Sequence, residues 1–277
     1  MNWSRDCRIN NHWMKTESSE ALEARRQRHA QMLKLVAKGF YNELMNYGVQ
    51  KNEVLTVAGH LLDNIMQNDG SPPKTAEYYN RLFTIPDIRD TWGAEKRLAV
   101  HQVSLGPLEP ALVSWVGAWL QTPFIRDSFQ RPFPELEDDL NAYFEHPRRR
   151  YFVIYFQREP VGLIGAENLD PQSGKLEMRK LVGHPTLQGK GIGKRATFLF
   201  LYYVFVILKF RKVYLHSLDI NMRNINLNTK FGFELEGVFF EDAVIQQQSR
   251  DVVRMGLRAR VWLELFNPGA RGTSSSQ

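Results

Sequence analysis

The chain has 277 residues, of which 43% are hydrophobic and 24% charged, a balance that is typical of a globular protein and excludes a largely disordered one. Its formal net charge of +6 favours an anionic partner only weakly, because a cofactor with several phosphates would account for it as well as nucleic acid would. The single cysteine, Cys7, excludes an intrachain disulfide and a multi-cysteine zinc site, and the histidines include no H-x-x-x-H pair. We therefore expect no metal site and a reducing, cytoplasmic location.

Residues 1–18 are polar and irregular, and we expect a flexible leader there, since they lack the apolar core of a signal peptide. The longest apolar run, residues 196–208, is shorter than the roughly 20 residues that a membrane span requires. It therefore predicts a buried helix and no membrane contact.

Residues 19–95 are predicted to form a small helical module. Apolar residues recur at spacings of three and four from residue 19 to 47, a second helix starts at Asn52, and a short third one starts at Thr75. The simplest interpretation of a basic cluster on the first helix, RRQR, is that it lies on a face exposed to solvent. A DNA-binding helix-turn-helix does not fit, because the first helix is too long and the second is not basic. We expect no nucleic-acid partner.

Residues 96–266 are predicted to form one α/β (α+β) domain with a mixed central sheet flanked by helices. The first strand is expected at residues 98–103, followed by a helix that Gly106-Pro107 opens and by a second helix around residues 136–144. Further strands are expected at 151–156, 161–166, 175–182, 212–218, 234–240 and 252–257, with a helix at 221–230. The tail, 267–277, is of low complexity and predicted to be disordered.

The segment 188–193, QGKGIG, lies between a predicted strand and the long apolar helix. A glycine turn at this junction leaves backbone N–H groups free at the positive end of the helix dipole, which suits a phosphate. The dinucleotide fingerprint does not fit, because Lys194 stands at its third glycine, and the Walker pattern also fails. The segment resembles motif A of the GNAT acyl-CoA-dependent N-acetyltransferases, with Gln188, Gly191 and Gly193 matching. A plain strand-to-helix turn is the alternative.

Two further features support this resemblance. From residue 97 the predicted order, β-α-α-β-β-β-α-β-α-β-β, resembles the whole GNAT fold. Residues 221–233 look like motif B of the family, in which Asn221, Lys230, Gly232 and Phe233 match. The Gly237 turn, the late strand and paired tryptophans resemble the subgroup that acts on ribosomal-protein N-termini, polyamines and nucleotide-linked amino sugars.

The resemblance implies that an acyl group, usually acetyl, is transferred from coenzyme A to an amine without a metal. It places the pyrophosphate over the motif-A turn and the pantetheine arm along the preceding strand. Two asparagines of motif B would hold pantetheine or substrate, with helix capping as the alternative. The implied cofactor-binding residues are Val182, Gly183, Gln188, Gly189, Lys190, Gly191, Ile192, Gly193, Lys194, Asn221 and Asn224.

An amine is protonated at neutral pH, so the transfer needs a general base. Glu177 is the first candidate, because some family members place their glutamate at this strand position. Strand alternation puts Glu177 and Arg179 on one face and Lys180 on the other, and a Glu177–Arg179 surface pair is the alternative. Glu167 is a second candidate base, and a chain of water molecules is a third route.

Many family members carry, at the position of Asn228, a tyrosine that protonates the departing thiolate. An asparagine amide can hydrogen-bond sulfur but has no titrating proton to donate. Either the thiolate leaves without an acid, or another group such as His216 substitutes. A packed strand histidine is the alternative for His216.

The first hypothesis is therefore an N-acetyltransferase that moves acetyl from acetyl-CoA to the primary amine of a small molecule or amino sugar, by direct attack of the deprotonated amine. Alternatives are acylation of a protein N-terminus or lysine, use of a longer acyl chain, and a non-catalytic acyl-CoA-binding regulatory domain. The helix at 193–208 is apolar on every face. We expect the N-terminal helices, or a second subunit of a homodimer, to cover it.

Overall fold

The computed structural model describes residues 19–46, 48–51, 53–55, 57, 58, 61, 82–126, 129, 132–183, 185–187, 189–219 and 221–267. The predicted leader, the tail from residue 268 and most of the second and third helices of the N-terminal module lie outside these residues. The boundaries predicted for the module and the following domain stay predictions.

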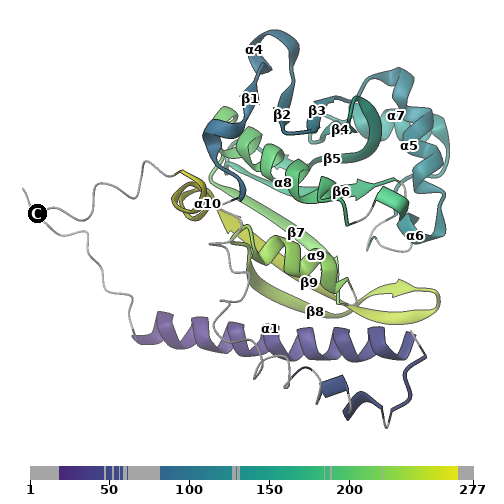
Figure 1. The fold of residues 1–277 in the computed structure, drawn as a ribbon, viewed down its shortest axis with the longest axis vertical. Helices are drawn as coiled ribbons and strands as arrows, with labels where there is room; N and C mark the ends of the chain where they lie inside the picture. Colours follow the sequence, from purple (N-terminus) through teal and green to yellow (C-terminus); the bar gives the residue numbers. More distant parts are fainter. Residues whose placement is uncertain are drawn as a thin grey trace, which may run out of the picture.

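Within the described residues, nine strands form one mixed sheet (Figure 1). Every neighbouring pair is antiparallel except β6 and β7, which are parallel. In spatial order the strands are β1 (Arg89–Asp90), β2 (Leu98–Val100), β3 (Val103–Pro107), β4 (Arg150–Phe156), β5 (Glu159–Asp170), β6 (Lys175–Val182), β7 (Lys212–Leu218), β9 (Gln248–Arg258) and β8 (Glu234–Ile245). The predicted fold class is confirmed.

The start of this sheet differs from the prediction of one strand followed by a helix at Gly106. The chain reverses at His101, whose φ is 52°, so that Val100 pairs with Val103 and the segment forms two strands. Gly106 lies inside β3, and helix α5 (Val113–Leu120) begins only after a 3-10 turn. A tight turn without glycine or proline gives little signal in the sequence, which is why the hairpin was missed.

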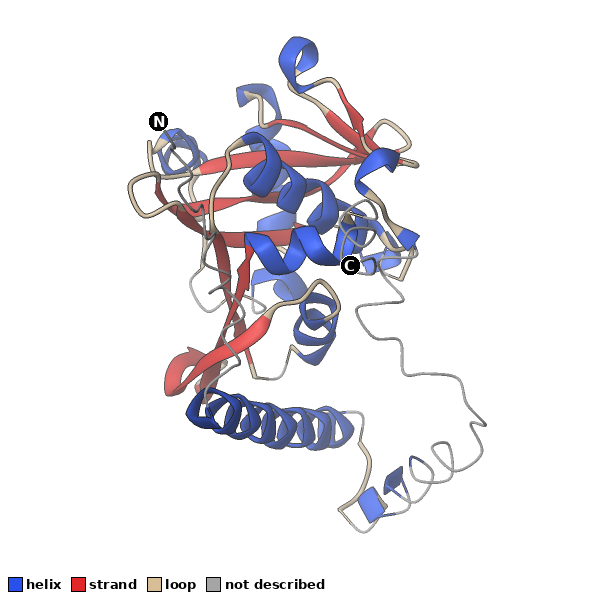
Figure 2. Cartoon of the chain, turned by 90° about the vertical axis from the view of Figure 1, so that its left-hand side faces the viewer, coloured by secondary structure: helices blue, strands red, loops and turns tan. Residues whose placement is uncertain are grey.

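Helices cover both faces of the sheet (Figure 2). On one face, α5, α6 (Pro123–Arg126) and α7 (Glu137–Glu145) lie over a cluster that includes Tyr151, Leu163 and Leu181. On the other face, α8 (Ile192–Tyr202), α9 (Met222–Thr229) and α10 (Ala259–Phe266) share the larger core. A short helix, α4 (Trp92–Glu95), connects β1 and β2. This two-sided packing follows from strands whose successive side chains point to opposite faces.

Helix α8 is buried along most of its length, as its all-round apolar sequence predicts, and it ends in a π-helical turn, Tyr203–Ile207. The Phe198 ring packs against Phe83 at 5.3 Å between centroids, against Trp262 at 5.5 Å and against Phe266 at 5.3 Å. Trp262 and Phe266 belong to α10, a helix that the sequence analysis did not anticipate. Part of the cover on α8 therefore comes from the C-terminal side of the chain.

Helix α1 (Ser19–Asn46) lies elsewhere, against the hairpin of β8 and β9 and beside α9 (Figures 1 and 2). Its Met32 and Leu35 pack on the main core, and Lys38 Nζ donates to Asp251 Oδ2 at 2.9 Å. The expectation that the N-terminal helices cover α8 was therefore wrong for α1. Residues near the end of the predicted module do contact this helix as expected: Phe83 packs against Phe198, and the Tyr202 hydroxyl donates to Asp90 Oδ2 at 2.9 Å. The apolar side of α1 packs instead on the β8–β9 end of the sheet, whose apolar residues also need to be shielded from water. A homodimer stays a prediction.

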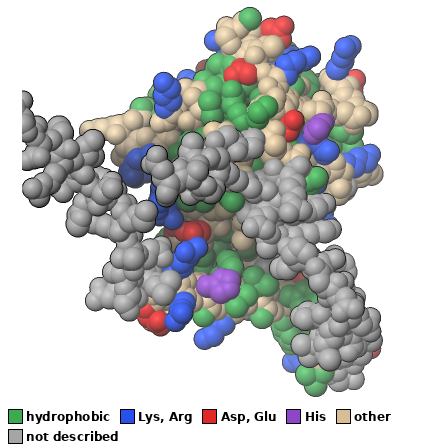
Figure 3. Space-filling view, turned by 60° about the vertical axis from the view of Figure 1, so that its left-hand side comes forward, with side chains coloured by type: hydrophobic (Ala, Val, Ile, Leu, Met, Phe, Trp, Pro, Cys, Tyr) green, Lys and Arg blue, Asp and Glu red, His purple; other side chains and the backbone are tan. Residues whose placement is uncertain are grey.

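Lys and Arg side chains are spread over one face of the molecule among hydrophobic and acidic ones, with no single basic band (Figure 3). None of the helices in the described ranges is both long and apolar enough to cross a membrane.

Candidate active site

The candidate site begins where β6 and β7 separate. The two strands pair over three residue pairs only, from Lys175 with Lys212 to Glu177 with Tyr214. Both strands continue beyond this point, to Val182 and Leu218. Beyond it, the backbone N–H and C=O groups on their facing edges no longer form hydrogen bonds with each other. Backbone edge groups seek hydrogen-bond partners, and an extended ligand with amide groups can supply them.

The turn that precedes α8 has the geometry of an anion site. Gly189 and Gly191 adopt φ values of 78° and 74°, which side chains rarely tolerate. A Cβ at Gly191 would lie only 2.7 Å from Arg195 Nη1, and Arg195 itself donates to the Lys190 carbonyl at 3.2 Å. The first N–H groups of α8 lack partners within the helix and are available to a phosphate.

The other described residues predicted for this turn lie where they could contact a phosphate, through a side chain or through the backbone. Lys190 is exposed and Lys194 is half-buried, whereas Ile192 is buried in the core and offers only its backbone. The Gly193 carbonyl accepts from Thr197 Oγ1 at 2.8 Å. Gln188 lies outside the described residues.

At the end of β6, Gly183 is already engaged within the protein. Its N–H donates to the Val161 carbonyl at 2.7 Å, and a Cβ at this position would lie 2.5 Å from the Trp119 ring. Glycine is therefore required for α5 to approach the strand. Val182 is half-buried and pairs with Gly162 of β5 on its other side.

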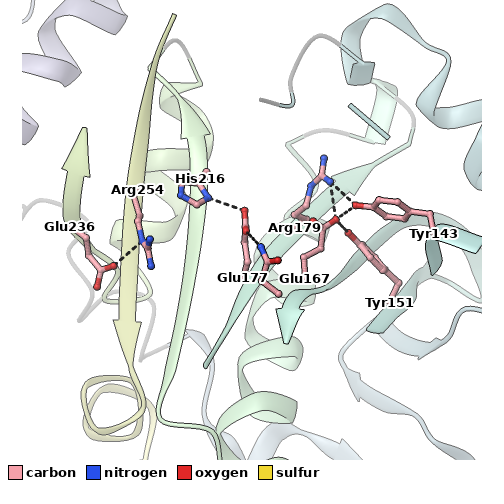
Figure 4. A network of polar contacts seen from close by, with 9 residues as sticks. Tyr143, Tyr151, Glu167, Glu177, Arg179, His216, Glu236 and Arg254 are labelled. Atoms are coloured by element: carbon pink, nitrogen blue, oxygen red, sulfur yellow. Dashed lines mark hydrogen bonds and ion pairs between the residues drawn. The ribbon is translucent and has the colours of Figure 1, made fainter. Parts of the chain in front are cut away.

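Two of the predicted catalytic residues meet at the point where β6 and β7 separate (Figure 4). Glu177 Oε1 lies 2.8 Å from His216 Nδ1, and Glu177 Oε2 accepts from Asn168 Nδ2 at 2.8 Å. The Glu177 side chain is 7% exposed and that of His216 11%. A buried carboxylate at Nδ1 fixes the orientation of the imidazole and leaves Nε2 as the reactive nitrogen. The sequence analysis had proposed both residues but had not paired them.

Glu167 lies in a separate cluster on the same face (Figure 4). Its Oε1 accepts hydrogen bonds from the hydroxyls of Tyr143 and Tyr151 and from Arg179 Nη1, the last at 2.8 Å. Burial raises the pKa of the Glu167 carboxyl, but the Arg179 charge and these hydrogen bonds outweigh burial, so the pKa lies below its usual value. The carboxylate is thus ionised and well solvated by protein groups, which makes it a poor base. Arg179 pairs with Glu167, not with Glu177 as the surface-pair alternative assumed.

Lys180 is a polar residue that the sequence analysis did not propose for the site. Its Nζ donates to Asn228 Oδ1 at 2.8 Å and to Thr197 Oγ1 at 3.0 Å, and both acceptors are fully buried. Neither acceptor carries a charge, and removal of the ammonium from water lowers the pKa of Lys180 to about 7. The signal was present in the strand alternation, which places Lys180 on the face of β6 that α8 and α9 cover, where a lysine is unusual.

The asparagines of motif B continue this network along α9. Asn228 Nδ2 donates to Asn224 Oδ1 at 3.1 Å, and Asn224 Nδ2 donates to Ser217 Oγ at 3.4 Å. Asn221 caps α9, since its side chain accepts from the Asn224 N–H at 3.3 Å. Asn228 and Asn224 therefore hold α9 against β6 and β7. For Asn221, the structure shows helix capping, the alternative to binding pantetheine or substrate.

Comparison with known proteins agrees with this geometry. Residues 116–233, from α5 to the end of motif B, match the Acetyltransferase (GNAT) family model. The chain contains a GNAT acetyltransferase domain. The predicted family is confirmed, while α1, β1–β3, β8, β9 and α10 lie outside the matched residues.

Similar proteins include two bacterial spermidine N(1)-acetyltransferases. That of Escherichia coli K12 is 28% identical over 167 residues, which cover 57% of this chain and 86% of the relative. That of Vibrio cholerae is 29% identical over 138 residues, which cover 50% and 76%. A crystal structure of spermidine N-acetyltransferase from Vibrio cholerae in complex with CoA and spermine aligns with a TM-score of 0.55 at 25% identity, covering 58% of this chain and 98% of that one.

Proposed function

We propose that this protein is an N-acetyltransferase that moves the acetyl group of acetyl-CoA to a primary amine of a small molecule. One observation carries the proposal: the GNAT domain places the Glu177–His216 pair at the point where β6 and β7 separate. The amine that accepts the acetyl group needs a base there to remove its proton. The acetyl-CoA that donates the group needs an unpaired strand edge to bind its amide groups.

The cofactor site that we propose follows the open edge of β6 to the turn before α8. Acetyl-CoA supplies the activated thioester. Residues from Gly189 to Gly193 offer N–H groups to the phosphates, and Lys190 and Lys194 offer positive charge. Val182 offers strand-edge groups on the side away from β5, whereas Gly183, whose N–H donates to the Val161 carbonyl, and Gln188 belong to the proposal through the family's motif alone. Asn221 and Asn224 are assigned to positioning α9, because both are engaged within the protein.

We assign the base to His216, with Glu177 as the residue that orients it. His216 Nε2 takes a proton from the ammonium of the substrate, and the Glu177 carboxylate stabilises the imidazolium that forms. The freed amine attacks the thioester carbonyl carbon, the new C–N bond forms, and the C–S bond breaks; the nitrogen loses one more proton as the amide forms, which balances the proton that the departing sulfur takes up. The products are an N-acetylated amine and the thiol of coenzyme A.

Lys180 is our candidate for the acid that protonates the departing sulfur. Asn228, at the position of the usual tyrosine, is fully buried and holds Lys180 through its carbonyl oxygen. The ammonium of Lys180 can release a proton near neutral pH, which an asparagine cannot do. The two residues together would therefore perform the role of the missing phenol.

A polyamine is the first substrate class to test, because the relatives described above carry spermidine in their names. Amino sugars and peptides with a free N-terminus represent the other acceptors, and longer acyl-CoA thioesters the other donors. The single cysteine keeps a cytoplasmic location as our expectation.

The test is thiol release from acetyl-CoA, followed with each amine in turn. Release with at least one amine is expected, and His216→Ala should abolish most of it. Coenzyme A binding without release for any amine would contradict the enzymatic proposal and favour a regulatory acyl-CoA-binding domain.

A further inference from the structure

A basic hollow lies over β1 to β4, outside the acetyl-CoA site. It has a volume of about 340 Å³ and is lined by Arg89, Thr91, Arg97, Ser104, Tyr155 and Arg158, together with a small alanine. These side chains stand on the face of the sheet opposite α8, since the alternate residues of β2 and β3 belong to the core under α8.

The strand register explains why the surface is hollow here. Arg89 lies opposite Ala99, Ala99 opposite Ser104, and Ser104 opposite Tyr155, so these four residues form one row across four strands. Small side chains occupy the middle of the row, and long ones stand at both ends. The hollow is therefore built by the sequence of the sheet itself.

Gly106 makes room for the arginine next to this row. A Cβ at Gly106 would lie 3.4 Å from the Arg97 guanidinium carbon and 3.2 Å from the Tyr155 ring. Without it, the Arg97 guanidinium lies across the sheet, 5.0 Å from the centre of the Tyr155 ring. This contact directs the planar fork of Arg97 along the hollow.

Among the residues that the structure describes, no acidic partner balances the charges in the hollow. No carboxylate is among the described residues that line it, and none of Arg89, Arg97 and Arg158 forms an ion pair within the described ranges. Arg254 and Arg258, by contrast, each pair with a glutamate. Like charges gathered around a cavity repel one another, and a bound anion removes that cost.

We propose that this hollow binds a small anion that bears a phosphate or pyrophosphate group, at a site separate from the acetyl-CoA turn. Guanidinium groups bind phosphate oxygens through paired N–H donors, and the Ser104 and Tyr155 hydroxyls add two more donors. A volume of about 340 Å³ suits a single small ligand. A nucleic-acid strand would need basic surface well beyond the hollow.

The test is a calorimetric titration of the full chain with inorganic pyrophosphate. Saturable binding is expected, with a loss of about tenfold or more in both Arg97→Gln and Arg158→Gln. Arg258→Gln is the matched control, because it removes the same charge from a residue that pairs with Glu234, and it should bind as the wild type does. Arg158 is exposed in the turn between β4 and β5, so its variant should fold normally.

A parallel titration in excess coenzyme A separates the two phosphate sites. Unchanged pyrophosphate binding supports the proposal, whatever the acetyltransferase assay shows. Three results would overturn it: no saturable binding, binding that both arginine variants leave intact, or competition by coenzyme A, which would place the pyrophosphate at the turn before α8.

Discussion

Lys180→Met is expected to stabilise the protein at low pH and to lose most of this advantage at high pH. In the unfolded chain a lysine stays protonated up to its ordinary pKa of 10.5, whereas Lys180 in the folded protein releases its proton near pH 7. Between these values the unfolded state binds more protons, so wild-type stability rises with pH. Methionine has a similar length and no charge to bury, so this rise should disappear in the variant.

The size of the effect follows from the shift. A pKa lowered from 10.5 to about 7 corresponds to a cost of about 5 kcal/mol below pH 7, which falls to about 2 kcal/mol at pH 9. The variant also leaves Asn228 Oδ1 without its hydrogen bond, at a cost of about 2 kcal/mol that does not depend on pH. The net gain is therefore about 3 kcal/mol at pH 6 and close to zero at pH 9.

Urea unfolding of both proteins at pH 6 and pH 9 measures this difference. Lys190→Met is the matched control, because Lys190 is exposed and its removal should change the unfolding free energy little at either pH. Parallel pH dependence of wild type and Lys180→Met would refute the argument that Lys180 carries a buried, unbalanced charge.

Three further predictions concern the site and α1. Gly191→Ala should destabilise the turn by about 1 kcal/mol, because φ is 74° there, and should raise the KM for acetyl-CoA more than it lowers kcat. His216→Ala should lower kcat by roughly 10² to 10⁴. Glu177→Gln should lower kcat less and change the pH–rate profile, because Glu177 acts through His216. Equal losses of kcat in both variants, with no change in pH dependence, would contradict these roles. Lys38→Met should cost less than about 1 kcal/mol of unfolding free energy, because the Lys38 side chain is 56% exposed in its pair with Asp251, and acetyl transfer should not change.

The sequence predicted the parts of the molecule that depend on local patterns. Alternation placed Glu177 and Arg179 on the face of β6 opposite Lys180, and the glycines of QGKGIG predicted the turn before α8; the structure agrees on both. The all-round apolar character of residues 196–208 required burial, which is also observed.

Contacts between distant segments could not be read in the same way. The pairing of Glu177 with His216 depends on the parallel register of β6 and β7 and on where these strands separate. Lys180 reaches Asn228 only because α9 packs on β6, 48 positions further along the chain. Neither the Glu177–His216 contact nor the Lys180–Asn228 contact follows from spacing in the sequence.

The cover of α8 shows a different kind of error. Trp262 and Phe266 are four positions apart and lie on one side of a short helix, so α10 had a signal that was overlooked. The N-terminal helices offered a longer apolar stripe and were assigned to α8 instead. Two surfaces needed cover, and amphipathicity alone does not tell which helix meets which surface.

The central claim is that this chain transfers acetyl from acetyl-CoA to an amine at the Glu177–His216 pair. The most direct measurement incubates the protein with acetyl-CoA and spermidine and quantifies acetylated spermidine by mass spectrometry together with the free thiol. The account predicts equal amounts of both products from the wild type and almost none from His216→Ala. Acetylated product formed by His216→Ala at the wild-type rate would contradict it.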